Sequence, residues 1–324
     1  MLALLTALSA CGSDDGGSGG AGALDTIKAK IGAAVGGGGI HSTVKDDENA
    51  PNRDNTPIVA VNEAAGTKTF DGNGATVDYS NINDGYIMAK YDGDNPKIKV
   101  QITNTDKGDD TYTYDLDPNS GYQALPLTQG SGSYKVAVYT NIQGDKYAVA
   151  AEKQVKMKLK DRFSPYLRPS QYVNYVDSSK CVAKTPEVTD GTKSDLAAAE
   201  QIFLFVVGHV SYDHEKAATV QSGYLPDVDE TLDTGMGICF DFASLTAAML
   251  RSQGIPCKLI VGYAGSAYHA WVAIYSRQSG EFAAIIEFKG DKYNMADPTF
   301  AAAGDKADPN VVGDGTNYQP IYYY

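Results

Sequence analysis

Hydrophobic and polar positions alternate with a period of two through the first half of the chain. Ser133–Thr140 is the clearest example of this pattern, which is typical of a half-buried strand. Similar runs, separated by Asp-Gly and Asn-Gly turn signals, cover Thr76–Tyr79, Gly85–Tyr91, Lys97–Thr103, Thr111–Leu116, Gly132–Ile142 and Lys146–Leu159. About seven short strands at this spacing predict an antiparallel β-sandwich over residues 56–160.

The period changes to that of an α-helix from residue 192 onward. Thr192 and Asp195 have the spacing of a capping box, which marks the start of a first helix. The apolar positions of this helix are Leu196, Ala199, Ile202, Phe203 and Val206. A second helix is predicted from Cys239 to Gln253, because its apolar residues share one face and Gly254 and Pro256 then end it.

Three strands follow the second helix and complete an α+β pattern. They are Cys257–Tyr263, Tyr268–Tyr275 and Ala283–Lys289.

The chain has 324 residues, which is enough for two domains with hydrophobic cores. We therefore expect a signal segment (1–11), a flexible Gly-rich linker (12–55), the β-sandwich (56–160), a Pro- and Ser-containing connector (161–191) and an α+β domain (192–324).

The composition excludes several classes of protein. Acidic residues outnumber basic ones by 40 to 27, and this excess argues against binding of nucleic acid, which needs a basic stripe. Four cysteines without a C-x-x-C pair are too few and too scattered for a disulfide framework or a zinc cluster. His209 and His214 lack the helical H-E-x-x-H arrangement, so we expect neither a metal nor a cofactor. After the N-terminus, no apolar run is long enough to predict a transmembrane helix.

The first eleven residues resemble the signal of a bacterial lipoprotein. An apolar run leads into Leu-Ser-Ala-Cys, which ends at Cys11, and a Gly-, Ser- and Asp-rich stretch follows. The resemblance implies acylation of the Cys11 thiol and a lipid anchor on the extracellular face of the bacterial cell membrane. No Lys or Arg precedes the run, so we expect that the start is placed late or that the sequence is trimmed. The alternative is a chance cysteine after an apolar terminus.

The predicted sandwich resembles the immunoglobulin-like modules of surface proteins. The chain contains 22 tyrosines, and such residues suit strands that are half exposed to water, because the ring packs while the hydroxyl stays solvated. No cluster of residues in this segment carries obvious chemistry. We therefore interpret it as a scaffold.

Three residues in the α+β part combine into a candidate catalytic site. Cys239 lies at the start of the second helix, where free backbone N–H groups and the helix dipole favour a thiolate. Gly235 and Gly237 would leave room for a substrate. His269 lies on a strand, on the face that we expect to be polar, and Asp297 ends an extended segment just before a proline. A cysteine at a helix start, taken alone, is more often a small core residue.

The order of these motifs is similar to that of the transglutaminase-like superfamily. The chain reads G-x-C, then L-R-x-x-G-I-P, V-G-Y, H-A-W and D-P-T, over about residues 195–300. The resemblance implies a papain-like triad in which Cys239 is the nucleophile, His269 the general base and acid, and Asp297 the group that orients the imidazole. The tetrahedral oxyanion needs donors, and the candidates are the backbone N–H of Cys239 and the side chain of Tyr212.

This resemblance implies an enzyme that acts on amide bonds of peptides or proteins, and cell-wall peptides are one candidate substrate. With water as acceptor it would be a peptidase or amidase, which we favour; with an amine it would be a cross-linking transglutaminase. Two other interpretations stay open: a non-catalytic surface protein for adhesion or binding, and a structural role in the cell envelope.

Overall fold

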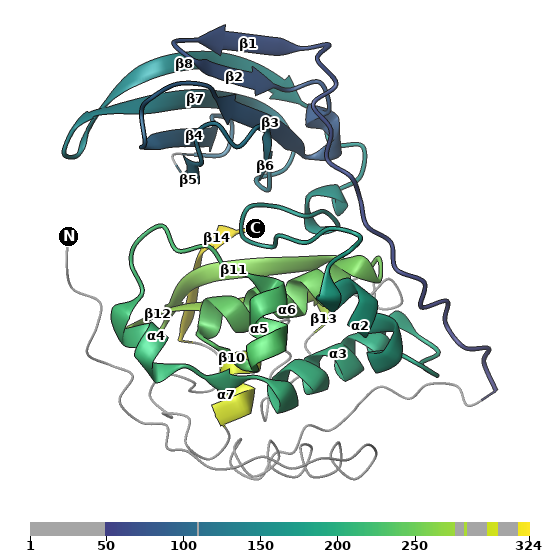
Figure 1. Ribbon diagram of the computed structural model, residues 1–324. Helices are drawn as coiled ribbons and strands as arrows, with labels where there is room; N and C mark the ends of the chain where they lie inside the picture. Colours follow the sequence, from purple (N-terminus) through teal and green to yellow (C-terminus); the bar gives the residue numbers. More distant parts are fainter. Residues whose placement is uncertain (1–48, 109, 276–281, 284–296, 304–316) are drawn as a thin grey trace. The chain divides into compact units, whose positions relative to one another are not determined.

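The computed structural model describes residues 49–108, 110–275, 282–283, 297–303 and 317–324 (Figure 1). The chain divides into two compact units. One comprises residues 60–171 with Tyr324, and the other comprises residues 1–59 with 172–323. The predicted signal segment 1–11 with Cys11, most of the linker 12–55, and the predicted strand Ala283–Lys289 beyond Ala283 lie outside the described residues.

The first unit contains two four-stranded antiparallel sheets, with the strand orders β1-β2-β3-β6 and β5-β4-β7-β8. Their strands are β1 (Thr69–Gly72), β2 (Ala75–Asp78), β3 (Tyr86–Tyr91), β4 (Ile98–Asn104), β5 (Thr111–Leu116), β6 (Gln123–Pro126), β7 (Gly132–Gln143) and β8 (Lys146–Met157); two short 3-10 helices are η1 (Ile82–Asp84) and η2 (Ser164–Tyr166). Six of the strands match the predicted runs within about two residues, whereas β1 and β6 were not predicted.

The period-two pattern of this unit is confirmed by the burial of β4. Ile98, Val100 and Ile102 are at most 1% exposed, and the residues between them are half-buried. Val100 pairs in register with Val138 of β7 and Tyr114 of β5, both of which are also fully buried. The apolar side of the pattern therefore forms the core of this sheet.

The second unit is a mixed α/β structure built around one antiparallel sheet, β13-β12-β11-β14. Its elements are α2 (Lys180–Val188), α3 (Asp195–His209), β9 (Ser211–Tyr212), α4 (His214–Thr219), α5 (Val228–Thr234), β10 (Met236–Gly237), α6 (Cys239–Ser252), β11 (Cys257–Ala264), β12 (Ala267–Tyr275), β13 (Phe282–Ala283), α7 (Pro298–Ala303) and β14 (Tyr318–Tyr323). Helix α6 packs on β11 and β12 and also contacts α2, α3, α5 and α7 (Figure 1). None of the described helices is long and apolar enough to cross a membrane.

Helix α6 begins at Cys239 and ends one residue before the predicted end. The predicted apolar face is buried, and so is the rest of the helix from Asp241 to Ser252. Polar side chains of this helix form hydrogen bonds with groups close to them. The buried guanidinium of Arg251, for example, donates from Nε and Nη2 to the carbonyl oxygen of Cys257, at 3.0 and 2.8 Å.

The cap of α3 differs from the prediction. The helix begins at Asp195, and the Oγ of Ser194 accepts a hydrogen bond from the backbone N–H of Ala197 at 3.1 Å. Thr192 instead donates its hydroxyl to the carbonyl oxygen of Thr189. Helix α2, within the predicted connector, was also missed, because its apolar residues are few and Pro186 lies near its end.

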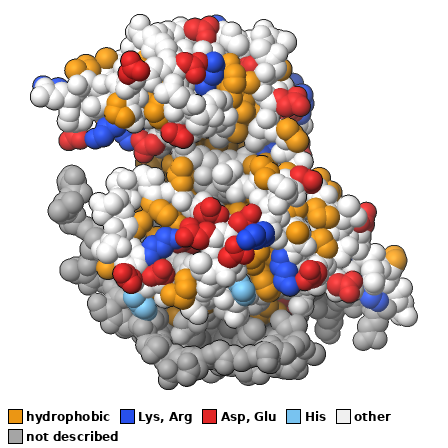
Figure 2. Space-filling view, viewed as in Figure 1, with side chains coloured by type: hydrophobic (Ala, Val, Ile, Leu, Met, Phe, Trp, Pro, Cys, Tyr) orange, Lys and Arg blue, Asp and Glu red, His pale blue; other side chains and the backbone are white. Residues whose placement is uncertain are grey.

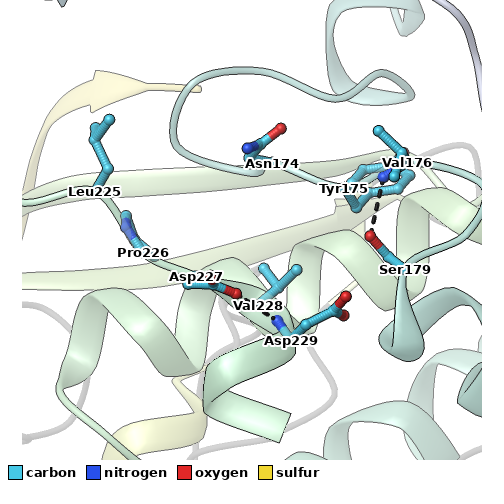
Figure 3. A pocket seen from close by; sticks show the side chains of 9 residues that line it. All are labelled: Asn174, Tyr175, Val176, Ser179, Leu225, Pro226, Asp227, Val228 and Asp229. Carbon is cyan, nitrogen blue, oxygen red and sulfur yellow. Dashed lines mark hydrogen bonds between the residues drawn. The ribbon is translucent and has the colours of Figure 1, made fainter. Parts of the chain in front are cut away.

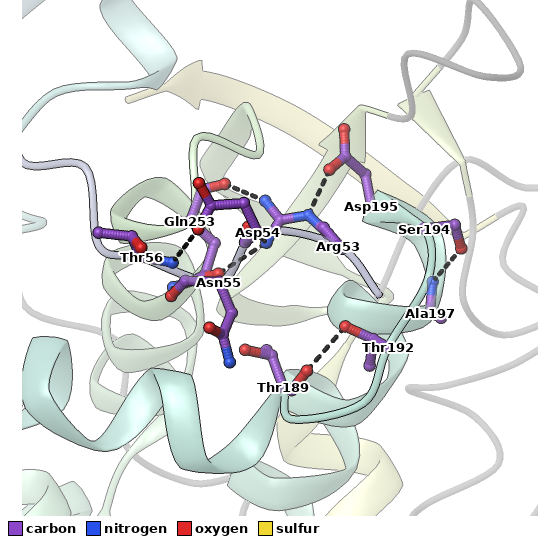
Figure 4. A network of polar contacts seen from close by, with 10 residues as sticks. All are labelled: Arg53, Asp54, Asn55, Thr56, Thr189, Thr192, Ser194, Asp195, Ala197 and Gln253. Carbon is purple, nitrogen blue, oxygen red and sulfur yellow. Dashed lines mark hydrogen bonds and ion pairs between the residues drawn. The ribbon is translucent and has the colours of Figure 1, made fainter. Parts of the chain in front are cut away.

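A segment near the start of the described chain is anchored to this unit by Arg53 (Figure 4). The guanidinium lies 2.7 Å from Asp195 Oδ1 on α3 and donates to both the side chain and the carbonyl oxygen of Gln253, just after α6. The Asn55 side chain donates to the carbonyl oxygen of Pro186, and the backbone N–H of Ile58 donates to that of Ser252. Residues 53–58 therefore form hydrogen bonds that link α2, α3 and α6.

We expect Arg53→Met to lower the free energy of unfolding of this unit by about 2 kcal/mol, because several partly buried acceptors lose their donor. The single tryptophan of the chain, Trp271, is 1% exposed within the unit, so its fluorescence during urea unfolding reports this unit. The matched control is Arg162→Met, since Arg162 is an exposed arginine over the Phe163 ring. An equal effect of the two substitutions would contradict the anchoring role.

Candidate active site

Cys239 is the first residue of α6, and its side chain is partly exposed. The two glycines before it have structural tasks that differ from the predicted one. Gly235 ends α5 in the left-handed region at φ 62°. A Cβ on Gly237 would lie 2.7 Å from the Cβ of Asp241. Both glycines therefore shape the turn into α6, and a side chain at either position would meet protein atoms.

His269 lies on β12 and is 5% exposed. The prediction that its face of the strand is polar is wrong. The imidazole stacks on the ring of Phe300 of α7 at a centroid distance of 4.5 Å and lies beside Trp271. Helix α7 and strand β14 supply aromatic side chains to this face, so the imidazole lies in a largely apolar setting.

Asp297 precedes α7 and accepts four hydrogen bonds. Its Oδ1 accepts from the backbone N–H groups of Thr299 and Phe300, both at 3.1 Å. Its Oδ2 accepts from Nε2 of His269 at 2.6 Å and from the hydroxyl of Tyr318 at 2.8 Å. The carboxylate, which is 3% exposed, therefore caps a helix with one oxygen and fixes the imidazole with the other.

Cys239 and Asp297 act on His269 together. Burial alone lowers the pKa of His269, but the charges of Asp297 and Cys239, and hydrogen bonds with both side chains, raise the pKa to about 10. The ring is therefore an imidazolium at neutral pH. Because Nε2 binds Asp297, Nδ1 is the ring nitrogen that remains for the sulfur. The structure thus couples the three residues that the sequence singled out.

A second charged group lies two residues after Cys239. The Asp241 carboxylate is fully buried, and its Oδ2 accepts from the backbone N–H of Ile238 at 2.8 Å and lies 2.9 Å from Nζ of Lys216. Its Oδ1 accepts from the Tyr224 hydroxyl at 2.5 Å. Burial and the neighbouring Asp241 raise the pKa of Tyr224. Sequence reasoning missed this junction, although the C-x-D spacing places a carboxylate at the third position of the helix.

The remaining predicted residues fall in different surroundings. Tyr212 lies on β9, which pairs with β10 so that Tyr212 is the register partner of Gly237. Its ring contacts that of His214 edge-on at 5.1 Å. Nε2 of His209 donates to the carbonyl oxygen of Leu232 at 2.6 Å. Among the described residues, no group of three or more His, Cys, Asp or Glu side chains could hold a metal ion.

The cavity in Figure 3, with a volume of about 380 Å³, lies between residues 174–179 and 225–229. Exposed Val176 and Leu225 lie on its rim, and acidic side chains gather over α5 beside it (Figure 2). Its carboxylates have structural partners: Asp227 caps α5, and Asp229 accepts from the first backbone N–H groups of α2. Tyr172 and Tyr224, which precede the two lining segments in the chain, contact the first turn of α6 at the Phe240 ring and at Asp241.

Comparisons with known proteins show which family part of this chain resembles. Residues 182–287 match the family profile described as the transglutaminase-like superfamily. The UPF0252 protein of Methanocaldococcus jannaschii is 24% identical over 241 residues, which cover 68% of this chain. The chain spans 65% of the length of that curated relative.

Two solved structures are similar over larger parts of the chain but at low identity. One is described as a candidate cysteine protease from Cytophaga hutchinsonii, with 16% identity, a TM-score of 0.37, and coverage of 74% of this chain and 83% of that one. The other is the transglutaminase of red sea bream, with 15% identity, a TM-score of 0.27, and coverage of 69% and 54%.

Proposed function

We propose, from the premise that residues 182–287 form a transglutaminase-like domain, that this protein is a cysteine enzyme which hydrolyses amide bonds of peptides or proteins. One observation carries the proposal. Nε2 of His269 lies 2.6 Å from Oδ2 of Asp297, and the charges of Asp297 and Cys239 and hydrogen bonds with both raise the pKa of the imidazole. A buried imidazole between a cysteine sulfur and a carboxylate is the arrangement that nucleophilic cysteine catalysis needs.

The reaction would take place in two steps. The sulfur of Cys239 attacks the amide carbonyl carbon, a C–S bond forms, and His269 gives its proton to the amine as the C–N bond breaks. Water then attacks the thioester and gives a proton to the neutral imidazole. As the C–S bond breaks, a carboxylic acid is released and the thiolate and imidazolium are restored. The backbone N–H of Cys239 is our candidate for one oxyanion donor, and Tyr212, whose strand adjoins Gly237, is the candidate for a second.

The acceptor of the acyl group defines the second candidate function, a cross-linking transglutaminase. The experiment is to incubate the full chain with a peptide mixture, with and without a primary amine, and to follow masses by mass spectrometry. We expect pairs of shorter peptides whose masses add up to that of the parent peptide plus one water, and none of these with Cys239→Ala. Amine-linked peptides in place of cleaved ones would favour the transferase, and no change in any peptide would contradict both.

A non-catalytic binding role is the third candidate. We place this binding function in the first unit. Its two antiparallel sheets are consistent with the immunoglobulin-like modules that we predict there. In that case the protein would bind peptides or cell-wall material without changing them. The peptide experiment separates this candidate from the two enzymes, because bound peptides would keep their masses.

We also propose that the chain is held at the extracellular face of the bacterial membrane by a lipid on Cys11. The support is the Leu-Ser-Ala-Cys sequence and the Gly-rich stretch after it. Radiolabelled palmitate should enter the protein in cells and should be lost in Cys11→Ala. Labelling that survives this substitution would overturn the anchor.

A further inference from the structure

Tyr318 lies on the C-terminal strand β14 and touches the carboxylate that fixes the imidazole. We propose that Tyr318 is a positioning residue of the reaction: its hydroxyl holds the Asp297 carboxylate in place, so that the imidazole of His269 faces Cys239. This inference rests on the proposed function and deepens it. It adds a residue 21 positions after Asp297 to the three that the sequence singled out.

The geometry gives each oxygen of Asp297 a defined task. A carboxylate offers about four acceptor positions, and here all four are occupied. The two backbone donors hold Oδ1. The Tyr318 hydroxyl and His269 Nε2 share Oδ2, at 2.8 and 2.6 Å. Among the described residues, the imidazole would be the one remaining donor to that oxygen without Tyr318, so His269 would be positioned by a carboxylate that it alone holds in place.

The tyrosine is held firmly enough to act in this way. Its ring packs on Trp271 at 5.0 Å and lies near the rings of His269 and Phe300. Strand β14 pairs with β11, with Tyr318 opposite Ala264. Close passage of the two strands requires Gly262, because a Cβ there would lie 2.1 Å from the carbonyl oxygen of Gln319.

The chemistry of the phenol suits a permanent donor. Burial, then the charge of Asp297 and the hydrogen bond to it, raise the pKa of Tyr318 far above its ordinary value. The hydroxyl therefore keeps its proton over the whole working range of pH. By donating to Oδ2 it holds that oxygen beside Nε2 of His269, so the other ring nitrogen stays turned toward the sulfur.

The test is Tyr318→Phe in the full chain, which keeps the ring and removes only the hydroxyl. We expect kcat for peptide hydrolysis to fall about 10- to 100-fold with KM unchanged. The second readout is the titration of His269 by NMR of ¹⁵N-labelled imidazoles, assigned with the His269→Ala variant. Loss of the donor leaves Oδ2 more basic, so the titration midpoint of His269 should move upward.

Tyr323→Phe, on the same strand, is the matched control and should leave both readouts unchanged. A purely structural role of Tyr318 would lower stability without moving the midpoint. An unchanged kcat together with an unchanged midpoint would overturn the positioning role. If the wild-type protein cleaves no peptide but the midpoint moves in Tyr318→Phe, the proposed hydrolysis fails and the assignment of Tyr318 as the residue that positions Asp297 and His269 stands.

Discussion

Cys239→Ser should reduce peptide hydrolysis by about 10⁴-fold or more. A serine hydroxyl has nearly the same size but ionises far less readily than a thiol. The imidazolium of His269 could therefore no longer pair with an anionic nucleophile. The measurement is the rate of appearance of cleaved peptides in the mixture described above.

The matched control for this substitution is Cys257→Ala. Cys257 is fully buried on β11, and burial raises the pKa of its thiol to about 12, so it takes no part in the chemistry. We expect wild-type activity in this variant. Residual activity of Cys239→Ser within about tenfold of the wild type would contradict a nucleophilic role for Cys239.

Asp297→Asn should lower kcat/KM by about 10⁴-fold. The amide can still accept from the backbone N–H groups at the start of α7, so the local fold should persist. The charge that opposes the effect of burial on His269 is lost, however, and the imidazole becomes neutral near pH 7. Asp145→Asn, in the exposed turn between β7 and β8, is the matched control and should change neither activity nor stability.

The same substitution has a defined dependence of stability on pH. The pKa of His269 is raised on folding, so its contribution to stability is fully present below its ordinary pKa of about 6.5 and is lost as the pH rises through about 10. We expect Asp297→Asn to cost about 3 kcal/mol at pH 6 and progressively less toward pH 10, followed by Trp271 fluorescence in urea. A cost that does not depend on pH would contradict a charged His269.

Much of the fold follows from local patterns in the sequence. The period-two runs and turn signals located six of the strands in the first unit, and Gly254 and Pro256 located the end of α6. The caps were harder to predict, since Thr192 and Ser194 both fit a cap at the start of α3 and only tertiary contacts decide between them. Strand β14 was not predicted, because its partner β11 lies more than 50 residues away in the chain.

In the candidate site, too, local motifs were predictable from the sequence, whereas contacts between distant elements were not. Motif order identified Cys239, His269 and Asp297, and the structure couples them. The surroundings of His269 were predicted incorrectly, because a strand pattern cannot show that another strand brings an aromatic ring over the same face. Tyr318 carried no local signal at all. It is one of four tyrosines in the last seven residues, and only the pairing of β14 with β11 selects it.

The central claim is that His269 and Cys239 act as one unit, and iodoacetamide tests it without a known substrate. The rate of alkylation is measured between pH 6 and 10 in the wild type and in His269→Ala, and peptide mapping resolves each cysteine. We predict that Cys239 reacts much faster than buried Cys181 and Cys257, and that its rate near pH 6.5 falls at least about tenfold in His269→Ala. Equal rates and equal pH profiles for Cys239 in both proteins would contradict the account.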